Sequence, residues 1–377
     1  MKVCILQTLH EHDDKRVFQK VARSLVRGGH EVVSIVPDTG EVPEAADGVT
    51  FRTVPATHGL VQRFFVLPKL IAAGRRERAG VYIGVEPESW VAALICKFTT
   101  GGKAVFDMHE HVQTEFSKFF PRAMRPPVEW LTVKIMRLFA RATDLIILTR
   151  ESFDPPWQGL SVPRITVINT NHLQPRCAHV PEELRARYAG KRVILHQGIF
   201  GDVRGSWQLL EAMKQLAPRY PDLVCVLLGR YVYGSEQEYR DAIRDAGLVA
   251  QLQFAGVVPY DAVPAYIALS EIGLILFQPG PLNHTLAMPH KLFDYMREAR
   301  PVVAPDFALE VGRIMREADC GLLTDVSDPA AIAAAIARLL DHPAEAQRLG
   351  QNGRRAVETQ YHWEAEEQVL LEAFGKL

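Results

Sequence analysis

Short apolar runs alternate with helical patterns along almost the whole chain, and this alternation constrains the fold more than any other feature. Strands that alternate with helices form parallel sheets with helices on both faces. The alternation therefore predicts an α/β protein. The strands expected in the first half are Val3–Leu6, Val32–Val36, Val81–Val85, Ala104–Phe106, Leu145–Leu148 and Ile165–Ile168.

The alternation stops after Ile165–Ile168, in a stretch that holds Pro175 and Pro181 and lacks strand periodicity, and it restarts at Val193–His196. A chain of 377 residues is long enough for two domains. We therefore expect two facing, Rossmann-like, doubly wound domains: residues 1–172, a linker at 173–189 and a second domain at 190–356. A C-terminal helix of about residues 357–377 is expected to pack back onto the first domain. The further strands expected in the second half are Leu223–Leu228, Leu252–Phe254, Ile272–Phe277, Val302–Ala304 and Gly321–Thr324.

The net charge and the cysteines limit which partners the protein can be expected to bind and in which cellular compartment it can be expected to work. The formal net charge is −1, so the chain as a whole has no attraction to nucleic acid. The five cysteines are odd in number and scattered, which favours a reduced, cytoplasmic setting. The N-terminus is interpreted as a buried first strand, and no apolar run reaches the ~20 residues that would span a bilayer.

A glycine-containing loop follows the strand Val193–His196. Glycines at a strand-to-helix turn let the backbone approach a phosphate, and a helix N-terminus favours negative charge. Gly198 lies in this loop, and Arg204 near its end adds a bidentate phosphate partner. The pattern is neither a dinucleotide fingerprint nor a Walker loop. An ordinary tight turn with a surface arginine is the alternative.

The segment Pro289–Met296 is the second candidate. Pro289 suits the first turn of a helix. Lys291 and Asp294 are three residues apart and so share one helix face. A cation there can meet a phosphate, and a carboxylate can accept hydrogen bonds from a ribose diol. A simple surface ion pair is the alternative interpretation.

Together these segments resemble the retaining GT-B glycosyltransferases, in particular the family 4 group and a subgroup common in surface-polysaccharide pathways. The resemblance runs the length of the chain and depends on the order and spacing of its pieces. Those pieces are His12–Phe18, Ala22–Leu25, Gly29–Val32, Phe106–Glu110, His196–Gly198, Arg204–Gly205, Phe254–Pro259, Pro289–Met296, Pro301–Val303, Asp328–Pro329 and Tyr361–Glu364.

The resemblance implies a donor site in the second domain. Arg204 and Lys291 would bind the diphosphate of a nucleotide sugar beside the Gly198 loop, and Asp294 would hold the ribose hydroxyls. The backbone around Val257 and Val258 would receive the base.

The resemblance also implies an acceptor side in the first domain. His109 would reach the donor sugar and, with Arg204 and Lys291, make up the catalytic set. The loop with Asp13, Asp14 and Arg16, together with Glu110, would border a hydroxyl acceptor. The implied reaction retains the anomeric configuration, needs no cofactor or metal, and stabilises the leaving diphosphate by cations.

The chain departs from the family pattern at four positions. Leu286 replaces the first of two glutamates that many members carry, and Asp294 replaces the second. Ile199 and Ala299 stand where an arginine and a glycine are frequent. Leu286 and Ile199 leave a degenerate transferase that serves as a partner subunit as one alternative. A nucleotide-sugar epimerase, which can share the fold, is the other.

Two His-Glu-His runs, His10–His12 and His109–His111, suggest a competing metal site. Imidazoles and carboxylates after strands can bind Zn²⁺ or Mn²⁺, and Asp13, Asp14 and Asp107 lie nearby in sequence. Their spacing matches no metal-binding motif. We therefore expect no metal site.

Two basic, aromatic stretches, residues 63–80 and 117–142, lie in the first half. The second holds six basic residues and one acid, with Phe119, Phe120 and Trp130 among them. This composition suits an anionic membrane surface at the inner face of the membrane and a lipid-linked acceptor. A solvated helix face with a soluble acceptor is the equal alternative.

Overall fold

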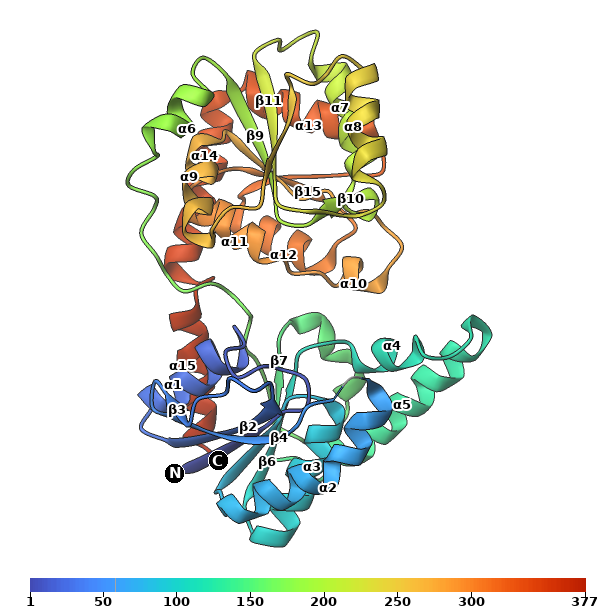
Figure 1. Ribbon diagram of the computed structural model, residues 1–377, viewed down its shortest axis with the longest axis vertical. Coiled ribbons are helices and arrows are strands. Elements are labelled where there is room, and N and C mark those ends of the chain that lie inside the picture. Colours follow the sequence, from blue (N-terminus) through green and yellow to red (C-terminus); the bar gives the residue numbers. More distant parts are fainter. Residues whose placement is uncertain (58) are drawn as a thin grey trace. The chain divides into compact units, whose positions relative to one another are not determined.

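The computed structural model describes residues 1–57 and 59–377, and it has the predicted α/β class with two doubly wound parallel sheets (Figure 1). The chain divides into two compact units. The first unit holds Met1–Asn169 and Trp363–Leu377, and the second holds Thr170–His362. The chain thus returns to the first unit at its C-terminal end.

The sheet of the first unit has eight strands in the order β3-β4-β2-β1-β5-β6-β7-β8. All neighbours are parallel except β3 and β4. The two-residue strand β3 and the seven-residue strand β4 were not predicted, and they form one edge of the sheet beside β2. The strands are β1 (Lys2–Leu6), β2 (Glu31–Asp38), β3 (Ala45–Ala46), β4 (Val49–Pro55), β5 (Val81–Gly84), β6 (Lys103–Met108), β7 (Leu145–Leu148) and β8 (Arg164–Thr166).

Helices cover both faces of this sheet. On one face, the C-terminal helix α15 (Trp363–Phe374) packs with the π-helix η1 (Val17–Ala22) and with α1 (Arg23–Arg27), and its apolar residues join the same buried cluster as strand β1. The Trp363 indole donates a hydrogen bond of 3.0 Å to Ser24 Oγ. The other helices of the unit are α2 (Leu60–Glu77), α3 (Pro87–Thr100), α4 (Val112–Ser117), η2 (Arg122–Met124), α5 (Arg125–Ala140), η3 (Glu151–Phe153) and η4 (Pro155–Trp157).

Helix α3 lies against the opposite face of the sheet. Gly84 makes this contact possible, because a Cβ there would lie 2.3 Å from the Cα of Trp90. The Trp90 ring stacks on Phe106 of β6 with 4.2 Å between ring centroids. An aromatic stack of this kind contributes more than its buried area alone.

The sheet of the second unit has six parallel strands in the order β13-β11-β9-β14-β15-β16. Its strands are β9 (Arg192–Gln197), β11 (Leu223–Leu228), β13 (Leu252–Gly256), β14 (Ile272–Leu274), β15 (Val302–Pro305) and β16 (Gly321–Thr324), with β10 (Phe200–Gly201) and β12 (Tyr231–Tyr233) as a separate pair. Its helices are α6 (Glu182–Arg187), η5 (Asp202–Arg204), α7 (Ser206–Leu216), α8 (Glu236–Asp245), η6 (Tyr260–Ala262), α9 (Val263–Leu269), α10 (Leu282–Thr285), α11 (His290–Arg297), α12 (Leu309–Ala318), α13 (Pro329–Asp341) and α14 (Pro343–Thr359).

The segment 173–189, expected as a linker, belongs to the second unit and contains α6. Contacts with the end of α11 hold it there. The amide of Cys177 donates to Glu298 Oε2 at 2.9 Å, and Arg297 donates to Gln174 Oε1 at 3.2 Å. The boundaries therefore fall at Asn169 and His362, because side-chain contacts that no sequence pattern reveals fix this segment.

Both sheets reverse their strand order once. In the first unit the reversal lies between β1 and β5, and in the second between β9 and β14. Ligands of doubly wound sheets bind outside the carboxyl ends of the strands at such a point. Each unit therefore has one position where its topology favours a binding site.

Candidate functional site

Three nitrogen-bearing side chains converge at the reversal point of the second sheet. His196 lies near the end of β9, Arg204 lies in η5 just after it, and Lys291 projects from the first turn of α11. Lys291 Nζ lies 3.3 Å from His196 Nε2. A Cβ built on Gly198 would lie 3.8 Å from the same Nζ, so the ammonium lies beside the glycine loop. The fold thus brings Gly198, Arg204 and Lys291 close together.

The electrostatics of this cationic cluster are unfavourable in the free protein. Burial, followed by the positive charge of Arg204, lowers the pKa of Lys291 to about 7. Burial and then both cations lower the pKa of His196 well below its usual value. Within residues 1–57 and 59–377, neither Arg204 nor Lys291 forms an ion pair with a carboxylate, and Arg204 Nε is buried without a hydrogen-bond partner. A bound anion would relieve this repulsion.

Close backbone packing fixes the position of Arg204. Gly205, with φ of 84°, starts α7, and a Cβ there would lie 2.3 Å from the carbonyl oxygen of Leu276. The Arg204 guanidinium lies 5.9 Å from the Tyr233 ring centroid and 6.0 Å from that of Phe277. Aromatic faces attract and orient a cation at this range. The arginine is therefore oriented rather than loose on the surface.

Asp294 differs from the expectation of an open ribose-binding carboxylate. Its side chain is buried, with 1% exposure. Its Oδ1 accepts a hydrogen bond from Asn171 Nδ2, and its Oδ2 accepts one from Gln197 Nε2, both at 2.8 Å. A ribose diol would have to reach this buried carboxylate at a remaining lone pair or after one of the two amides moves. The sequence indicated that Asp294 lies on the same helix face as Lys291, but it did not indicate that two amides hold the Asp294 carboxylate.

The expected base-binding loop follows β13, at the same carboxyl edge of the sheet. Val257 is 70% exposed and Val258 is half-buried. Burial, followed by the negative charge of Asp294, raises the pKa of the Tyr260 hydroxyl. Tyr260 directly follows this loop, so the loop ends close enough to Asp294 for the two groups to interact electrostatically. The second unit thus places all of the predicted donor-site residues at the carboxyl edge of one sheet.

In the first unit, a buried chain of charges lies at the carboxyl end of β6, the strand next to the reversal point between β1 and β5. The Arg16 guanidinium donates to Asp107 Oδ1 at 2.9 Å, and Asp107 Oδ2 lies 2.9 Å from His109 Nε2. Burial raises the pKa of Asp107, but Arg16 and His109 outweigh burial and hold that pKa below its usual range. Burial lowers the pKa of His109 more than Asp107 raises it. This chain leaves each charge with an opposite partner.

The structure revises the expectation for the acceptor-side loop. Arg16 is buried, and its guanidinium also donates to the carbonyl of Val167. It therefore supports the fold instead of bordering an acceptor. Asp14 caps the start of η1, because its Oδ1 accepts from the amides of Arg16 and Val17 at 2.8 Å. Asp13 and Glu110 are exposed.

Two residues of this unit were missed from the sequence as part of the site. Glu86 is buried and accepts hydrogen bonds from the amides of Thr8 and Leu9 at 3.2 and 3.1 Å, so it holds the loop after β1. His10 lies 3.1 Å from Asp14 Oδ2, and its ring centroid is 5.2 Å from that of His109. Burial lowers the pKa of His10, but Asp14 and Glu86 outweigh burial and raise it. For Glu86, the signal available in the sequence was its position directly before the proline that starts a helix.

The competing metal site finds no support in the geometry. Among the residues that the structure describes, no group of three or more His, Cys, Asp or Glu side chains is arranged to hold a metal ion. The two His-Glu-His runs contribute instead to the hydrogen bonds described above. Metal independence itself stays a prediction.

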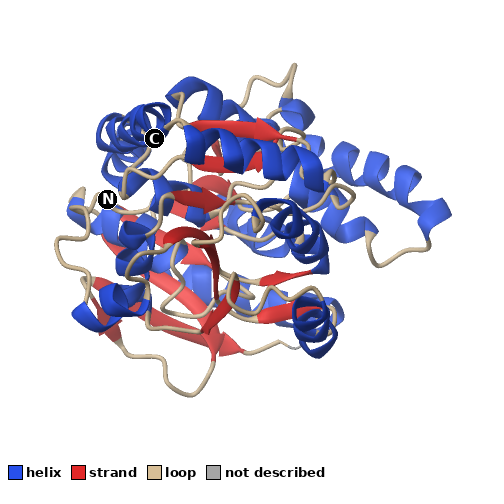
Figure 2. Cartoon of the chain, turned by 90° about the horizontal axis from the view of Figure 1, so that it is seen from above, coloured by secondary structure: helices blue, strands red, loops and turns tan. Residues whose placement is uncertain are grey.

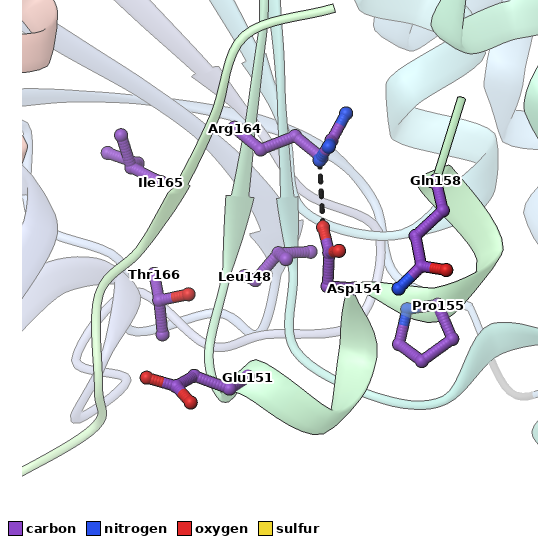
Figure 3. Close-up of a pocket in the computed structure, with 8 residues that line it drawn as sticks. All are labelled: Leu148, Glu151, Asp154, Pro155, Gln158, Arg164, Ile165 and Thr166. Atoms are coloured by element: carbon purple, nitrogen blue, oxygen red, sulfur yellow. Dashed lines mark hydrogen bonds and ion pairs between the residues drawn. The ribbon is translucent and has the colours of Figure 1, made fainter. Parts of the chain in front are cut away.

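A pocket of about 560 Å³ opens at the outer edge of the first sheet (Figure 3). Its two opposite charges, Arg164 and Asp154, pair with each other at 2.8 Å. None of the predicted site residues lines it. The lining residues are Leu148, Glu151, Asp154, Pro155, Gln158, Arg164, Ile165 and Thr166.

Two sequence families match the chain, one in each half. The family described as "Glycosyl transferase 4-like domain" matches residues 15–169, and the family described as "Glycosyl transferases group 1" matches residues 183–356. The first match ends at Asn169, where the chain leaves the first unit, and the second lies wholly in the second unit.

Solved structures share the fold over the full length. HepE of Anabaena, crystallised with UDP, superposes with a TM-score of 0.78 at 15% identity and full coverage of both chains. Sucrose-phosphate synthase of Thermosynechococcus elongatus gives 0.75 at 17% identity, covering all of this chain and 98% of that one. WaaG, a glycosyltransferase involved in lipopolysaccharide biosynthesis, gives 0.68 at 13% identity with full coverage of both.

A curated relative is the spore coat protein SA of Bacillus subtilis, which is 23% identical over 202 residues. The match covers 52% of each chain, so this chain spans about half the length of that relative. The two family matches, which together cover most of the chain, and the shared fold lead to one conclusion. The chain belongs to the glycosyltransferases of the GT-B fold, with a 4-like first domain and a group 1 second domain.

Proposed function

We propose that this glycosyltransferase transfers a sugar from a nucleotide-diphosphate donor to a hydroxyl acceptor with retention of anomeric configuration and without a metal ion. The observation that carries the donor assignment is the cationic cluster. Arg204 and Lys291 lower the pKa of neighbouring groups and have no carboxylate partner in the described part of the chain. A diphosphate supplies the negative charge that this cluster lacks.

The same cations supply the main catalytic effect in this proposal. When the bond between the sugar and the diphosphate breaks, negative charge grows on the leaving diphosphate. Fixed positive charges at that position stabilise the transition state more than the ground state. Arg204 is oriented by its packing, and Lys291 takes up a proton as the anion binds. No divalent ion is needed in this arrangement.

The remaining residues have supporting roles in the proposal. Val257 and Val258 receive the base by their backbone, and Asp294 meets the ribose once its amide partners shift. His109 is the catalytic residue of the first unit, with Asp13 and Glu110 on the acceptor side. Retention follows if the acceptor attacks from the face that the diphosphate leaves, with a leaving-group oxygen taking the acceptor proton.

A thermal-shift screen with UDP, GDP, ADP and dTDP tests the donor site. A ligand at 100 times its dissociation constant should stabilise the second unit by about 2.7 kcal/mol. UDP is the first candidate, because HepE was crystallised with it. We expect one nucleotide to give a clear upward shift, unchanged by EDTA. No shift with any of the four would contradict the donor assignment.

The same purified protein separates transfer from the alternatives. Release of nucleoside diphosphate that depends on an added hydroxyl acceptor identifies a transferase. Conversion of the nucleotide sugar without an acceptor would identify an epimerase. Binding without either reaction would identify a degenerate partner subunit.

A further inference from the structure

The helices α4 and α5 form a hairpin that extends from the body of the first unit (Figures 1 and 2). We call residues 112–141 the α4–α5 hairpin. Two sets of polar contacts fix its orientation. Ser117 Oγ donates to Glu129 Oε1 at 2.7 Å across the hairpin, and Arg137 donates to the carbonyls of Pro156 and Gln158 at 2.7 and 2.9 Å.

The outward face of α5 is apolar, which is unusual for a helix face in water. Trp130, Leu131, Ile135 and Leu138 recur at helical spacing and are 63%, 53%, 45% and 59% exposed. Phe119, near the turn of the hairpin, is 67% exposed. The face does not pack on the core, which buries Met136 and Ala140 instead. Exposed apolar patches of this kind mark an interaction surface.

The charges around this apolar face are almost all positive. Residues 117–142 carry six basic residues and one acid, a net charge of +5 in a chain whose total is −1, and Glu115, which lies just before them in the hairpin, pairs with Lys118. Arg122, Lys134 and Arg141 are exposed, and the Lys134 ammonium lies 5.4 Å from the Trp130 ring centroid. The one acid, Glu129, accepts the hydrogen bond from Ser117. An occupant of this surface must therefore be apolar in its interior and anionic at its rim.

We propose that the α4–α5 hairpin docks the enzyme on an anionic lipid bilayer. Trp130, Leu131 and Leu138 enter the interface, and Arg122, Lys134 and Arg141 contact lipid phosphates. An amphipathic helix with aromatic residues on one face and basic residues at its border binds the headgroup region in this way. No helix in residues 1–57 or 59–377 is long and apolar enough to cross a membrane, and the proposed contact is peripheral. A lipid-linked acceptor follows only if the proposed transfer reaction also holds.

Vesicle sedimentation with the full chain tests the docking surface. We expect the protein to pellet with vesicles of phosphatidylcholine and phosphatidylglycerol at low salt, but not with phosphatidylcholine alone. High salt should release it, because mobile ions screen the contacts between exposed charges. Trp130 provides a second readout. Of the five tryptophans, Trp90, Trp157 and Trp363 are buried, and Trp207, 37% exposed, lies in the second unit outside the hairpin. A blue shift of emission that docking of the hairpin causes should therefore come from Trp130 and be absent from Trp130→Phe.

Two sets of substitutions separate the apolar and basic contributions. Lys134→Ala with Arg141→Ala should weaken binding to the anionic vesicles about thirtyfold, since each basic residue contributes about one factor of five at an anionic surface. Leu131→Ser with Leu138→Ser should weaken it by a similar or larger factor. The matched control is Val249→Ser with Arg244→Ala, two exposed positions in the second unit, and should bind as the unaltered chain does.

Three outcomes would overturn the proposal. These are no pelleting with either vesicle, equal pelleting of the hairpin variants and the control, or self-association that the hairpin variants abolish while vesicles have no effect. The last result would assign the surface to a second copy of the chain. Melting curves of each variant exclude unfolding as a cause. The nucleotide screen needs no vesicles, so failure of the docking proposal and failure of the donor assignment are distinguishable.

Discussion

The reversal points of the two sheets share one topology but have opposite electrostatics. In the first unit, the charges are mutually compensated: Arg16 and His109 flank Asp107, and Asp14 pairs with His10. In the second unit, Arg204 and Lys291 repel each other and have no carboxylate partner in the described residues. The comparison teaches that a doubly wound sheet sets only the position of a site. The side chains decide whether the site is complete in the free protein or needs a charged ligand.

The largest expected effect is a loss of stability when a compensated charge of the first unit is removed. Asp107→Ala leaves Arg16 buried without its partner, and breaking a buried pair in this way costs about 3–5 kcal/mol of stability. Urea denaturation of the variant measures the loss. Asp13→Ala is the control, because an exposed substitution should stay within about 0.5 kcal/mol. If both variants unfold at the same urea concentration, the charge chain of the first unit contributes nothing to stability.

Arg204→Ala tests the uncompensated charges of the second unit. In contrast to Asp107→Ala, it should lower turnover and leave the stability of the free protein almost unchanged. Turnover should fall by about 10²–10³-fold, or about 2.7–4 kcal/mol, because a fixed transition-state donor is lost. Stability of the free protein should change little or rise, because one of two repelling cations is removed. Steady-state assays and melting curves measure the two effects, with exposed Arg244→Ala as the control. Activity within a few-fold of the unaltered enzyme would make Arg204 an ordinary surface residue.

Asp294→Ala distinguishes a binding carboxylate from a structural one. If the carboxylate holds the ribose, nucleotide affinity should fall by about 1.5–3 kcal/mol, the contribution of a hydrogen bond to a charged group. Some stability should also be lost, because Asn171 and Gln197 lose their acceptor. Calorimetric titration and thermal melting separate the two effects. Lower stability with unchanged affinity would assign Asp294 to the fold alone.

The smallest effect concerns pH. With a pKa of about 7, Lys291 is neutral in the free protein at higher pH, and a diphosphate must then bring a proton with it. Nucleotide affinity should therefore fall as pH rises above 7, by at most about tenfold per unit. Titrations across this range measure the slope. Lys291→Arg should flatten it, because arginine keeps its proton. A slope that survives in this variant would arise from another group.

The stability of the free protein should change with pH in the other direction. An unfolded chain keeps the proton on lysine up to a pKa of about 10.4, whereas folded Lys291 loses it near 7. The unfolded state thus binds more protons between these values, and the contribution of Lys291 to stability should rise with pH across that window.

The sequence by itself determined the fold class, most of the strands and the loops that carry the proposed donor-site residues. Apolar runs such as Leu145–Leu148 and Leu223–Leu228 are continuous over a few neighbouring residues, and burial on both faces of a sheet requires that local pattern. Gly198, Arg204 and Lys291 could be proposed from local glycine and cation positions together with the family resemblance, and their role in donor binding stays a prediction. The strand β4, next to the edge strand β3, was missed, since its partly exposed pattern is weaker.

Tertiary structure alone decided which charges are satisfied. Arg16 and Asp107 are 91 positions apart, and Asn171 and Asp294 are 123 apart, so no spacing indicates that they pair. The same holds for the outward face of α5, whose Leu131 and Leu138 have the periodicity of a core helix but are exposed. Local patterns report what a segment can do, whereas pairing and burial depend on which distant segments the fold places beside it.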